Sequence, residues 1–421
     1  MNNKLLILAE KVFAITSFVH YSGGPLLVIL SGGVSEGDEG DDPTSFALIN
    51  ILFSIIYLIA FALMALRWKK VIPVIFKGKL VWLLLVFAAC SYFWSAAPDI
   101  TKTRVIALTG TMIFSLYITS RYTLKEQLQL LGWTFGMIVI TSIIFAVLLP
   151  KFGQMGGVHA GAWRGIYNHK NVLGKMMVIS SMIFALLSLQ SQKHRWVLWG
   201  LLGSSIMLIL LSRASSPLLN LIILAGVLAI LHTLHWKYLF MVPALIGVSS
   251  FGTIIYTLIT ANAGQVAGVF GKDLTLTGRT NFWPLMLDKI RENPLTGYGF
   301  GAFWQGLDGP SAYIWNASTF KAPNGHNGYL DLCLELGLIG LSLYAIQFFI
   351  GFKKALENVR NIQTPDGFWP IMLFSYIVLA NLTESSLMLQ NNFLWVMQVS
   401  TFLSLNSHRS RKRKTYILEE I

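Results

Sequence analysis

Charged residues are scarce in this chain. Asp, Glu, Lys and Arg make up 12% of its 421 residues, whereas hydrophobic residues make up 54% and mean hydropathy is +0.61. Soluble globular proteins contain about 25% charged residues, so this composition excludes a soluble enzyme or a soluble binding module. It predicts instead an all-α protein that crosses a membrane several times.

Cysteine is rare, and the familiar cofactor motifs are missing. Cys90 and Cys333 are the 2 cysteines. Both fall inside predicted helices without metal-ligand spacing, so we interpret them as packing residues. The chain has no nucleotide phosphate-binding sequence, dinucleotide fingerprint or CxxC pair, which predicts that it works without ATP or a redox cofactor. Internal repeats typical of many secondary transporters are not apparent either.

Apolar runs of roughly 20 residues, the length that crosses a bilayer, recur along the chain. We predict about twelve transmembrane helices, near residues 8–31, 45–66, 80–97, 104–120, 130–150, 171–191, 195–212, 216–234, 237–259, 327–352, 366–386 and 391–407. The predicted organisation is nine transmembrane helices over 1–259, a large outer loop with short helices over 260–326, three transmembrane helices over 327–408 and a basic cytoplasmic tail over 409–421.

The distribution of Lys and Arg predicts the orientation. With the amino terminus inside, about 20 of the 32 basic residues fall on the inner side, and the acidic run from Glu36 to Asp42 falls outside. The net charge of +13 then mostly reflects the topology of the chain. The basic inner surface is also expected to prefer anionic lipid. Nucleic acid binding is the weaker interpretation.

Five polar turns fall on the predicted outer side. They are residues 163–171 with Arg164 and His169, 212–216 with Arg213, 278–280 with Arg279, 324–328 with His326 and Asn327, and 381–384 with Glu384. Any one of them alone fits a solvated turn. Because all five lie on one side and several adjoin helix ends, together they predict a functional site there.

The longest connection runs from about Ile259 to His326, longer than a loop without function usually is. Within it, apolar residues such as Phe282, Leu285 and Met286 recur at helical spacing over residues 281–291, which predicts a short helix lying on the membrane. We expect this loop to form a folded cap over the site. Its Trp and Tyr side chains are either membrane-interface anchors or sugar-stacking platforms.

The most specific motif is His326-Asn327, followed after nine residues by Gly337 and then by Gly340. Supporting pieces are Gly278-Arg279-Thr280 with Trp283, Asn293-Pro294 with Gly297-Tyr298-Gly299, Asn168-His169-Lys170-Asn171, and Ser212-Arg213. With these motifs the chain resembles, over nearly its whole length, the bacterial O-antigen ligase and polymerase superfamily. The nearest branch is that of the exopolysaccharide polymerases.

The resemblance implies a GT-C-like, multi-pass fold in the bacterial cytoplasmic (inner) membrane, with the active site on the outer, periplasmic side. It implies a metal-independent glycosyltransferase that polymerises oligosaccharide repeats carried on polyprenyl diphosphate. The implied partners are this lipid-linked donor, a sugar-hydroxyl acceptor and membrane lipid. A chain-length regulator is a further implied partner, and nucleic acid is not expected.

Transfer from a polyprenyl diphosphate needs a base for the attacking hydroxyl. His326 precedes a predicted helix, whose positive end disfavours the imidazolium and keeps a neutral base available near pH 7. The resemblance gives His326 the same role, and a hydrogen-bonded interface histidine is the structural alternative. Transfer also needs stabilisation of the departing diphosphate. Arg213 and Arg279 are the predicted catalytic arginines, with Arg164 third, because a guanidinium makes paired hydrogen bonds to phosphate.

The remaining substrate-binding candidates are His169, Asn327, Asp331 and Glu384. His169 is either a diphosphate ligand or an ordinary turn histidine, and Glu384 matches a family position without an assigned step. Asp331 and Glu335 share a helix face; they either orient His326 or a sugar, or pair with Lys or Arg from a neighbouring helix.

Gly337 and Gly340 indicate close helix packing rather than substrate contact.

Two alternatives to a polymerase stay open. The chain is alternatively an O-antigen ligase or a protein O-oligosaccharyltransferase that uses the same donor. In another class, it is a transporter or flippase for lipid-linked sugars, which would keep ionisable residues near the bilayer midplane. The gathering of these residues at one surface favours catalysis.

Overall fold

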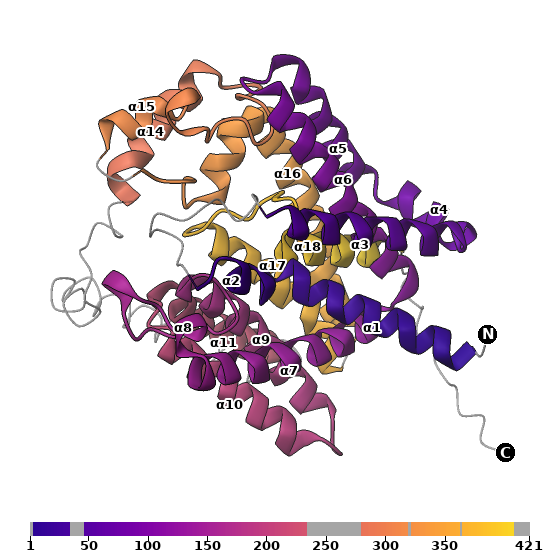
Figure 1. Ribbon diagram of the computed structural model, residues 1–421. Helices are drawn as coiled ribbons and strands as arrows, with labels where there is room; N and C mark the ends of the chain where they lie inside the picture. The colour runs from indigo at the N-terminus through magenta and orange to yellow at the C-terminus, as the bar shows by residue number, and fades with distance from the viewer. Residues whose placement is uncertain (1–2, 34–45, 234–278, 319–320, 363, 408–421) are drawn as a thin grey trace.

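Helices make up the architecture. The computed structural model describes residues 3–33, 46–233, 279–318, 321–362 and 364–407. Within these ranges the regular structure is helical, which confirms the all-α prediction (Figure 1). In chain order the helices are α1 (Asn3–Tyr21), α2 (Leu26–Leu30), α3 (Ala47–Ala65), α4 (Trp68–Lys77), α5 (Lys79–Cys90), η2 (Ser91–Trp94), α6 (Pro98–Arg121), α7 (Leu124–Leu148), α8 (Pro150–Gly153), η3 (Gly157–His159), α9 (Lys170–Gln190), α10 (Arg195–Leu211), α11 (Ser215–Thr233), α14 (Arg279–Glu292), η4 (Gly306–Asp308), α15 (Ala312–Ala317), α16 (Gly328–Asn361), η5 (Pro365–Phe368), α17 (Trp369–Asn381) and α18 (Phe393–Ser407).

Fewer helices than predicted are long and apolar enough to cross a membrane. Among the described residues α3, α7, α9 and α16 qualify, and α4 with α5 and η2 make a fifth candidate if that bent pair is one span. α10 and α11 are apolar but shorter, and α17 and α18 have only 13 and 15 residues. The run at 237–259 and the tail at 409–421 lie outside the described residues. The count of about twelve spans therefore stays a prediction.

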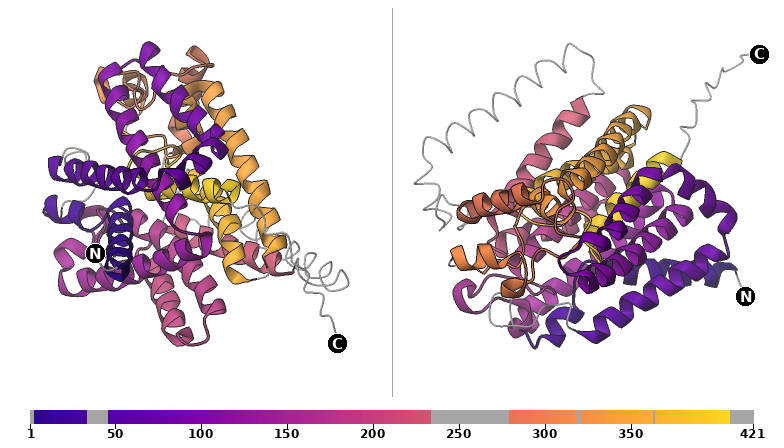
Figure 2. Two further views of the ribbon diagram at one scale, coloured as in Figure 1. Left: turned by 90° about the vertical axis from the view of Figure 1, so that its right-hand side faces the viewer. Right: turned by 90° about the horizontal axis from the view of Figure 1, so that it is seen from above.

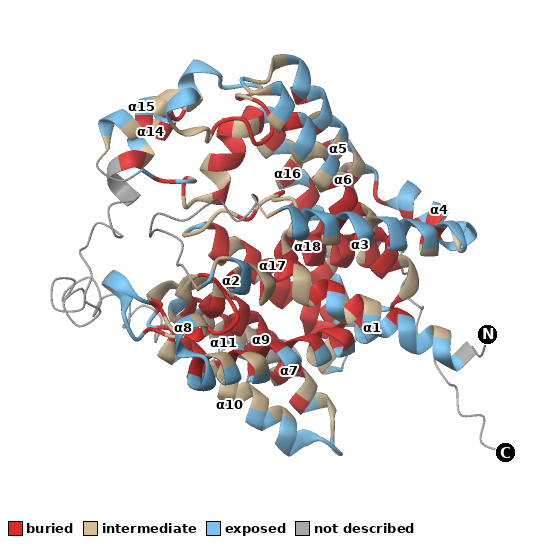
Figure 3. Cartoon of the chain, viewed as in Figure 1, coloured by how far each residue is buried: buried red, intermediate tan, exposed pale blue. Residues whose placement is uncertain are grey.

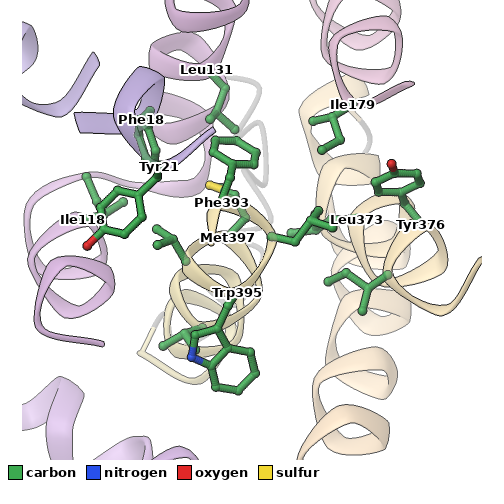
Figure 4. Close-up of a cluster of buried hydrophobic side chains, with 14 of the residues drawn as sticks. Phe18, Tyr21, Ile118, Leu131, Ile179, Leu373, Tyr376, Phe393, Trp395 and Met397 are labelled. Carbon is green, nitrogen blue, oxygen red and sulfur yellow. The ribbon is translucent and has the colours of Figure 1, made fainter. Parts of the chain in front are cut away.

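The centre of the molecule is formed by α18 and the helices around it. All residues of α18 from Phe393 to Ser404 are buried, and Figure 3 shows the same for much of α9 and α17. Phe18 of α1, Leu131 of α7 and Ile179 of α9 approach the aromatic ring of Phe393 (Figure 4). Because protein rather than lipid encloses α17 and α18, neither helix needs the full length of a membrane span.

Two polar contacts tie α1 to other segments. Midway along the helix, Glu10 forms ion pairs with Arg67 and Arg121, which charge assigns to the same predicted side. Just beyond the end of the helix, the Tyr167 hydroxyl donates to Ser22 Oγ (3.4 Å). The Glu10 pairs thus bring together two basic residues that the Lys and Arg pattern places on one side.

Gly337 breaks α16. Its φ of +63° and ψ of −169° are not helical, and a residue with a side chain rarely adopts such a φ. The carbonyls of Leu334 and Glu335 lose their helical partners at the break. They accept hydrogen bonds instead from the N–H groups of Tyr298 (2.8 Å) and Gly299 (2.9 Å). Irregular backbone within this candidate span is tolerated because other protein groups satisfy its hydrogen bonds.

The other side of the break is completed by the same loop. The N–H of Leu338 donates to the Pro294 carbonyl (2.8 Å), and that of Ile339 donates to Leu295 (3.2 Å). A Cβ atom at Gly337 would lie 2.2 Å from the carbonyl carbon of Leu295. The expected role in close packing between helices is therefore corrected. The absence of a side chain at Gly337 allows the backbone of residues 294–299 to pack against the break in α16.

The structure describes only part of the predicted cap. This part consists of α14 and α15, which lie beside the first half of α16 (Figures 1 and 2). α14 covers the predicted helix at 281–291. Its apolar residues Phe282 and Met286 are buried in a cluster with Phe303, Ile314 and Leu334. The prediction that this stripe lies on the membrane is wrong, because these two side chains pack on protein.

Gly337→Ala tests the broken helix. The added methyl must meet the Leu295 backbone, and the positive φ is strained for alanine, so we expect the free energy of unfolding to fall by about 1 to 3 kcal/mol. Gly203→Ala is the matched control, because Gly203 lies within α10 with open space around it, and alanine favours a helix interior. Thermal unfolding of the detergent-purified protein measures both; a Gly337→Ala variant as stable as the control would contradict the assigned role.

Candidate functional site

His326 occupies a fixed turn at the start of α16. Its φ of +46° is uncommon for a residue with a side chain, and its N–H donates to Asn324 Oδ1 (3.0 Å). Asn327 then caps the helix, accepting through Oδ1 from the N–H groups of Tyr329 (3.1 Å) and Leu330 (3.2 Å). The Asn327 side chain, predicted to bind substrate, therefore serves as a helix cap that holds the histidine at the positive end of α16.

Glu384, which follows α17, lies between His326 at the start of α16 and a lysine of α9. Its Oε2 atom lies 4.0 Å from His326 Nδ1 and 3.4 Å from the Nζ of Lys175 on α9. The Glu384 carbonyl accepts from the N–H of Gly328 (3.1 Å), which fixes the turn after α17 beside the start of α16. The three side chains are about one fifth exposed, so their charges are incompletely screened by water.

Lys175 is the member of this cluster that the sequence analysis missed. Its carbonyl accepts from the Tyr376 hydroxyl (2.9 Å), which ties α9 to α17. A lysine within the apolar run 171–191 is itself a signal, because ionisable residues in predicted spans usually face a partner or a cavity. We call His326, Glu384 and Lys175 the ionisable cluster.

Asp331 ties together the segments that carry this cluster. Its buried carboxylate accepts from the N–H of Gly325 (3.0 Å), from the indole N–H of Trp304 (2.8 Å) and from the hydroxyl of Ser385. Gly325 precedes His326, Trp304 belongs to the cap, and Ser385 follows the acid of the cluster. Of the predicted alternatives, the geometry favours orientation of His326.

Glu335 lies one turn further along α16. Its carboxylate accepts from the backbone of Gly301 and interacts with the charge of Arg104 on α6. A Cβ atom at Gly301 would lie 2.1 Å from Arg104 Cδ, so the cap packs tightly on α6 here. The charge of Arg104 favours the predicted alternative in which this acid interacts with a basic residue of a neighbouring helix, although the described residues contain no ion pair between the two side chains.

His169 caps α9 close to the cluster. Its Nδ1 accepts from the N–H of Asn171 (3.1 Å). Burial, followed by the neighbouring His159, lowers the pKa of His169 to about 4 despite the opposing effect of Glu384. The imidazole is therefore neutral near pH 7 and supplies no positive charge to a diphosphate, which favours the turn-histidine alternative.

Arg164 is a structural residue. Its side chain is only 1% exposed, and its guanidinium donates to the carbonyls of Phe152 (2.9 Å), Lys151 (2.9 Å), Gly33 (2.5 Å) and Asn168 (3.3 Å). The charge holds together the loop between α8 and α9 and the segment after α2. These contacts disfavour the predicted role in binding phosphate.

Of the two predicted catalytic arginines, the structure describes the side chain of Arg213 only. Arg213 is exposed in the turn between α10 and α11, with a φ of +51°. A Cβ atom at Gly174, the residue before Lys175, would lie 3.4 Å from Ser212 Oγ and 2.6 Å from Pro217. The turn of Arg213 thus packs beside the base of the lysine. Arg279 begins α14, and its side chain lies outside the described part of the structure.

Replacing Arg164 separates a structural from a phosphate-binding role. Arg164→Lys keeps the charge but leaves buried carbonyls unsatisfied, at about 1 to 3 kcal/mol each, so we expect a clear loss of unfolding free energy. Arg213→Lys, the matched control at an exposed position, should change stability by less than about 0.5 kcal/mol. Chemical unfolding in detergent measures both. An Arg164→Lys variant of normal stability that no longer binds a polyprenyl diphosphate would restore the phosphate role.

Comparison with known proteins finds a matching family and a similar protein. Residues 199–345 match the family described as O-antigen ligase. The match contains Arg213, Arg279, His326, Asn327 and Asp331. The exopolysaccharide production protein ExoQ of Rhizobium meliloti (strain 1021) is 24% identical over 294 residues, which cover 66% of this chain and 66% of that protein. The aligned part thus spans about two thirds of the relative's length. Together with the apolar helices, these similarities support a multi-pass membrane protein that is similar to the O-antigen ligase family.

Proposed function

We propose that this protein is a membrane glycosyltransferase that polymerises oligosaccharide repeats carried on polyprenyl diphosphate into an exopolysaccharide or O-antigen. The observation that carries the proposal is the ionisable cluster at the start of α16, where His326 and Glu384 lie 4.0 Å apart. The name of the Rhizobium relative, which refers to exopolysaccharide production, supports the polymerase branch.

In the proposed reaction His326 removes the proton of the attacking sugar hydroxyl. The hydroxyl oxygen bonds to the anomeric carbon of the donor sugar, and the bond from that carbon to the diphosphate oxygen breaks. The electron pair leaves with the polyprenyl diphosphate. We assign the proton to Nε2 of His326, since Nδ1 faces Glu384, and a positioned base of this kind contributes about 10² to 10⁴ in rate.

Three nearby charges influence the equilibrium between the neutral imidazole and the imidazolium of His326. The positive end of α16 disfavours the imidazolium by about 0.3 to 1 kcal/mol. A carboxylate about 4 Å away favours it by up to about 4 kcal/mol at an effective dielectric constant near 20, so Glu384 alone would dominate. Lys175 shares that carboxylate and offsets part of its field. We propose that Glu384 stabilises the imidazolium once the proton has arrived, while Lys175 keeps the resting histidine neutral.

The departing diphosphate carries negative charge that the protein must stabilise. We propose Arg213 and Arg279 for this task, because a guanidinium donates paired hydrogen bonds to phosphate oxygens. Arg213 is exposed, and its turn packs against Gly174 of α9 through Ser212 and Pro217, an arrangement that suits a ligand arriving from the membrane. No metal enters this scheme, and the site is proposed to face the outer, periplasmic side of the cytoplasmic membrane.

A ligase is the second candidate function. The matching family is described as O-antigen ligase, and a ligase or a protein O-oligosaccharyltransferase would use the same base and the same donor with another acceptor. A flippase is less well supported, because the ionisable cluster lies where α16 begins and α17 ends rather than at mid-helix positions. A chain-length regulator would fit the polymerase and not the ligase.

His326→Ala tests the proposed base. The variant should fold and bind the lipid-linked donor with unchanged affinity, yet transfer should slow by about 10² to 10⁴. Transfer with purified donor and acceptor gives the rate, and donor titration gives the affinity. His159→Ala is the matched control, because His159 is an exposed histidine for which we propose no role in the reaction.

Two outcomes would count against this assignment. Donor affinity that falls in proportion to the rate would place His326 in the diphosphate site. Full activity of His326→Ala would remove the base from this motif and revive the transporter alternative.

A further inference from the structure

We propose that α4 is an interfacial helix that forms a binding surface for the anionic headgroups of membrane lipids. This inference does not depend on the proposed reaction. The predicted spans leave residues 67–79 as a basic connection, whereas in the structure Trp68–Lys77 form a separate helix at the edge of the molecule (Figure 1).

The surface of α4 divides into three faces. An exposed apolar face has the helical spacing i, i+4, i+7, i+8; its residues are Trp68 (57% exposed), Ile72 (39%), Ile75 (37%) and Phe76 (68%). A basic face, about 100° to 200° further round the helix, carries Lys69, Lys70 and Lys77. The third face is buried against protein through Val71 and Val74.

This division fits a helix at a membrane boundary. Apolar side chains exposed on a protein surface face acyl chains in such helices, while neighbouring lysines reach the headgroups. The Lys69 ammonium lies 5.8 Å from the centre of the Trp68 ring, so the two faces meet at a tryptophan, which favours the interface. α3 carries Leu58 and Phe61 on an exposed apolar surface, and Leu66 follows directly after the helix; each of the three is at least 60% exposed.

The bend after α4 gives it a suitable direction. α4 and the helix formed by α5 and η2 meet at 80°. If the latter crosses the membrane, α4 lies close to the membrane plane. The indole N–H of Trp82 donates to the Ile75 carbonyl (3.0 Å) across this corner, and the Lys77 ammonium donates to the Ser407 carbonyl (3.1 Å) at the end of α18. These two hydrogen bonds connect α4 to α5 and α18.

Charge selects the lipid class. The basic face carries Lys69, Lys70 and Lys77, and no acidic residue lies between positions 67 and 79, so headgroups with net negative charge are preferred over zwitterionic ones. Phosphatidylglycerol has the required chemistry. Binding there would hold at headgroup level the same end of the molecule that contains the Glu10, Arg67 and Arg121 ion pairs.

The test uses the full chain reconstituted in phosphatidylcholine vesicles with spin-labelled phosphatidylglycerol or phosphatidylcholine. We expect the wild type to prefer the anionic probe, and Lys69→Gln with Lys70→Gln to reduce this preference at least about fivefold, the effect of about 1 kcal/mol for one lysine. The matched control is Lys151→Gln with Lys321→Gln, which removes two exposed lysines elsewhere and should retain the preference. An unchanged preference in the α4 variant, or an equal loss in the control, overturns the proposal.

A depth measurement checks the apolar face separately. Nitroxide labels are attached to Phe76→Cys or Lys70→Cys after replacement of Cys90 and Cys333 by serine. We expect the label at 76 to collide with dissolved oxygen and the label at 70 with an aqueous nickel complex. Equal access of the nickel complex to both positions would show that α4 lies in water. Shielding of position 76 from both reagents would show a protein partner, including a second copy, in place of lipid.

Discussion

The buried carboxylate of Asp331 fixes the relative positions of the segments that form the site. It accepts hydrogen bonds from the backbone before His326, from the cap tryptophan Trp304 and from Ser385 beside Glu384. A buried acceptor that lost these donors would cost about 1 to 3 kcal/mol for each unsatisfied group. The 4.0 Å separation between His326 and Glu384 therefore depends on a residue that needs no contact with substrate.

The spacing of the family motif has a physical meaning in this structure. Asn327 caps α16, and Gly337 breaks it. The nine residues between them form a rigid rod of about 14 Å, at about 1.5 Å for each residue. The histidine stands at one end of this rod, and residues 294–299 of the cap bond to the backbone at the other. The first part of α16 thus connects the cap directly to the histidine. In the proposed arrangement, α4 would position the far end of the molecule relative to the lipid.

Much of this arrangement follows from the sequence, and the exceptions have identifiable causes. Hydrophobic runs locate most helices, and the His326-Asn327 motif locates the start of α16. Burial is not visible in a local pattern, so Arg164 resembles a phosphate ligand although four carbonyls occupy it. The stripe of α14 likewise fits a membrane surface as well as it fits protein. Lys175 was overlooked because its partner Glu384 is 209 positions away in the chain, and α4 because its basic residues are typical of a loop.

The most direct test of the central claim, that Glu384 and Lys175 set opposing fields on a catalytic His326, is the pH dependence of transfer in matched variants. Loss of the carboxylate in Glu384→Gln removes the group that favours the imidazolium, so the acidic limb of the rate profile should move to lower pH, with a slower maximal rate. Loss of the ammonium in Lys175→Met leaves the full field of Glu384 on the histidine, so the same limb should move to higher pH. Opposite shifts from the two variants are the predicted result. A limb that stays at the wild-type pH in both variants, while the rates fall, would contradict the claim that this cluster contains the base.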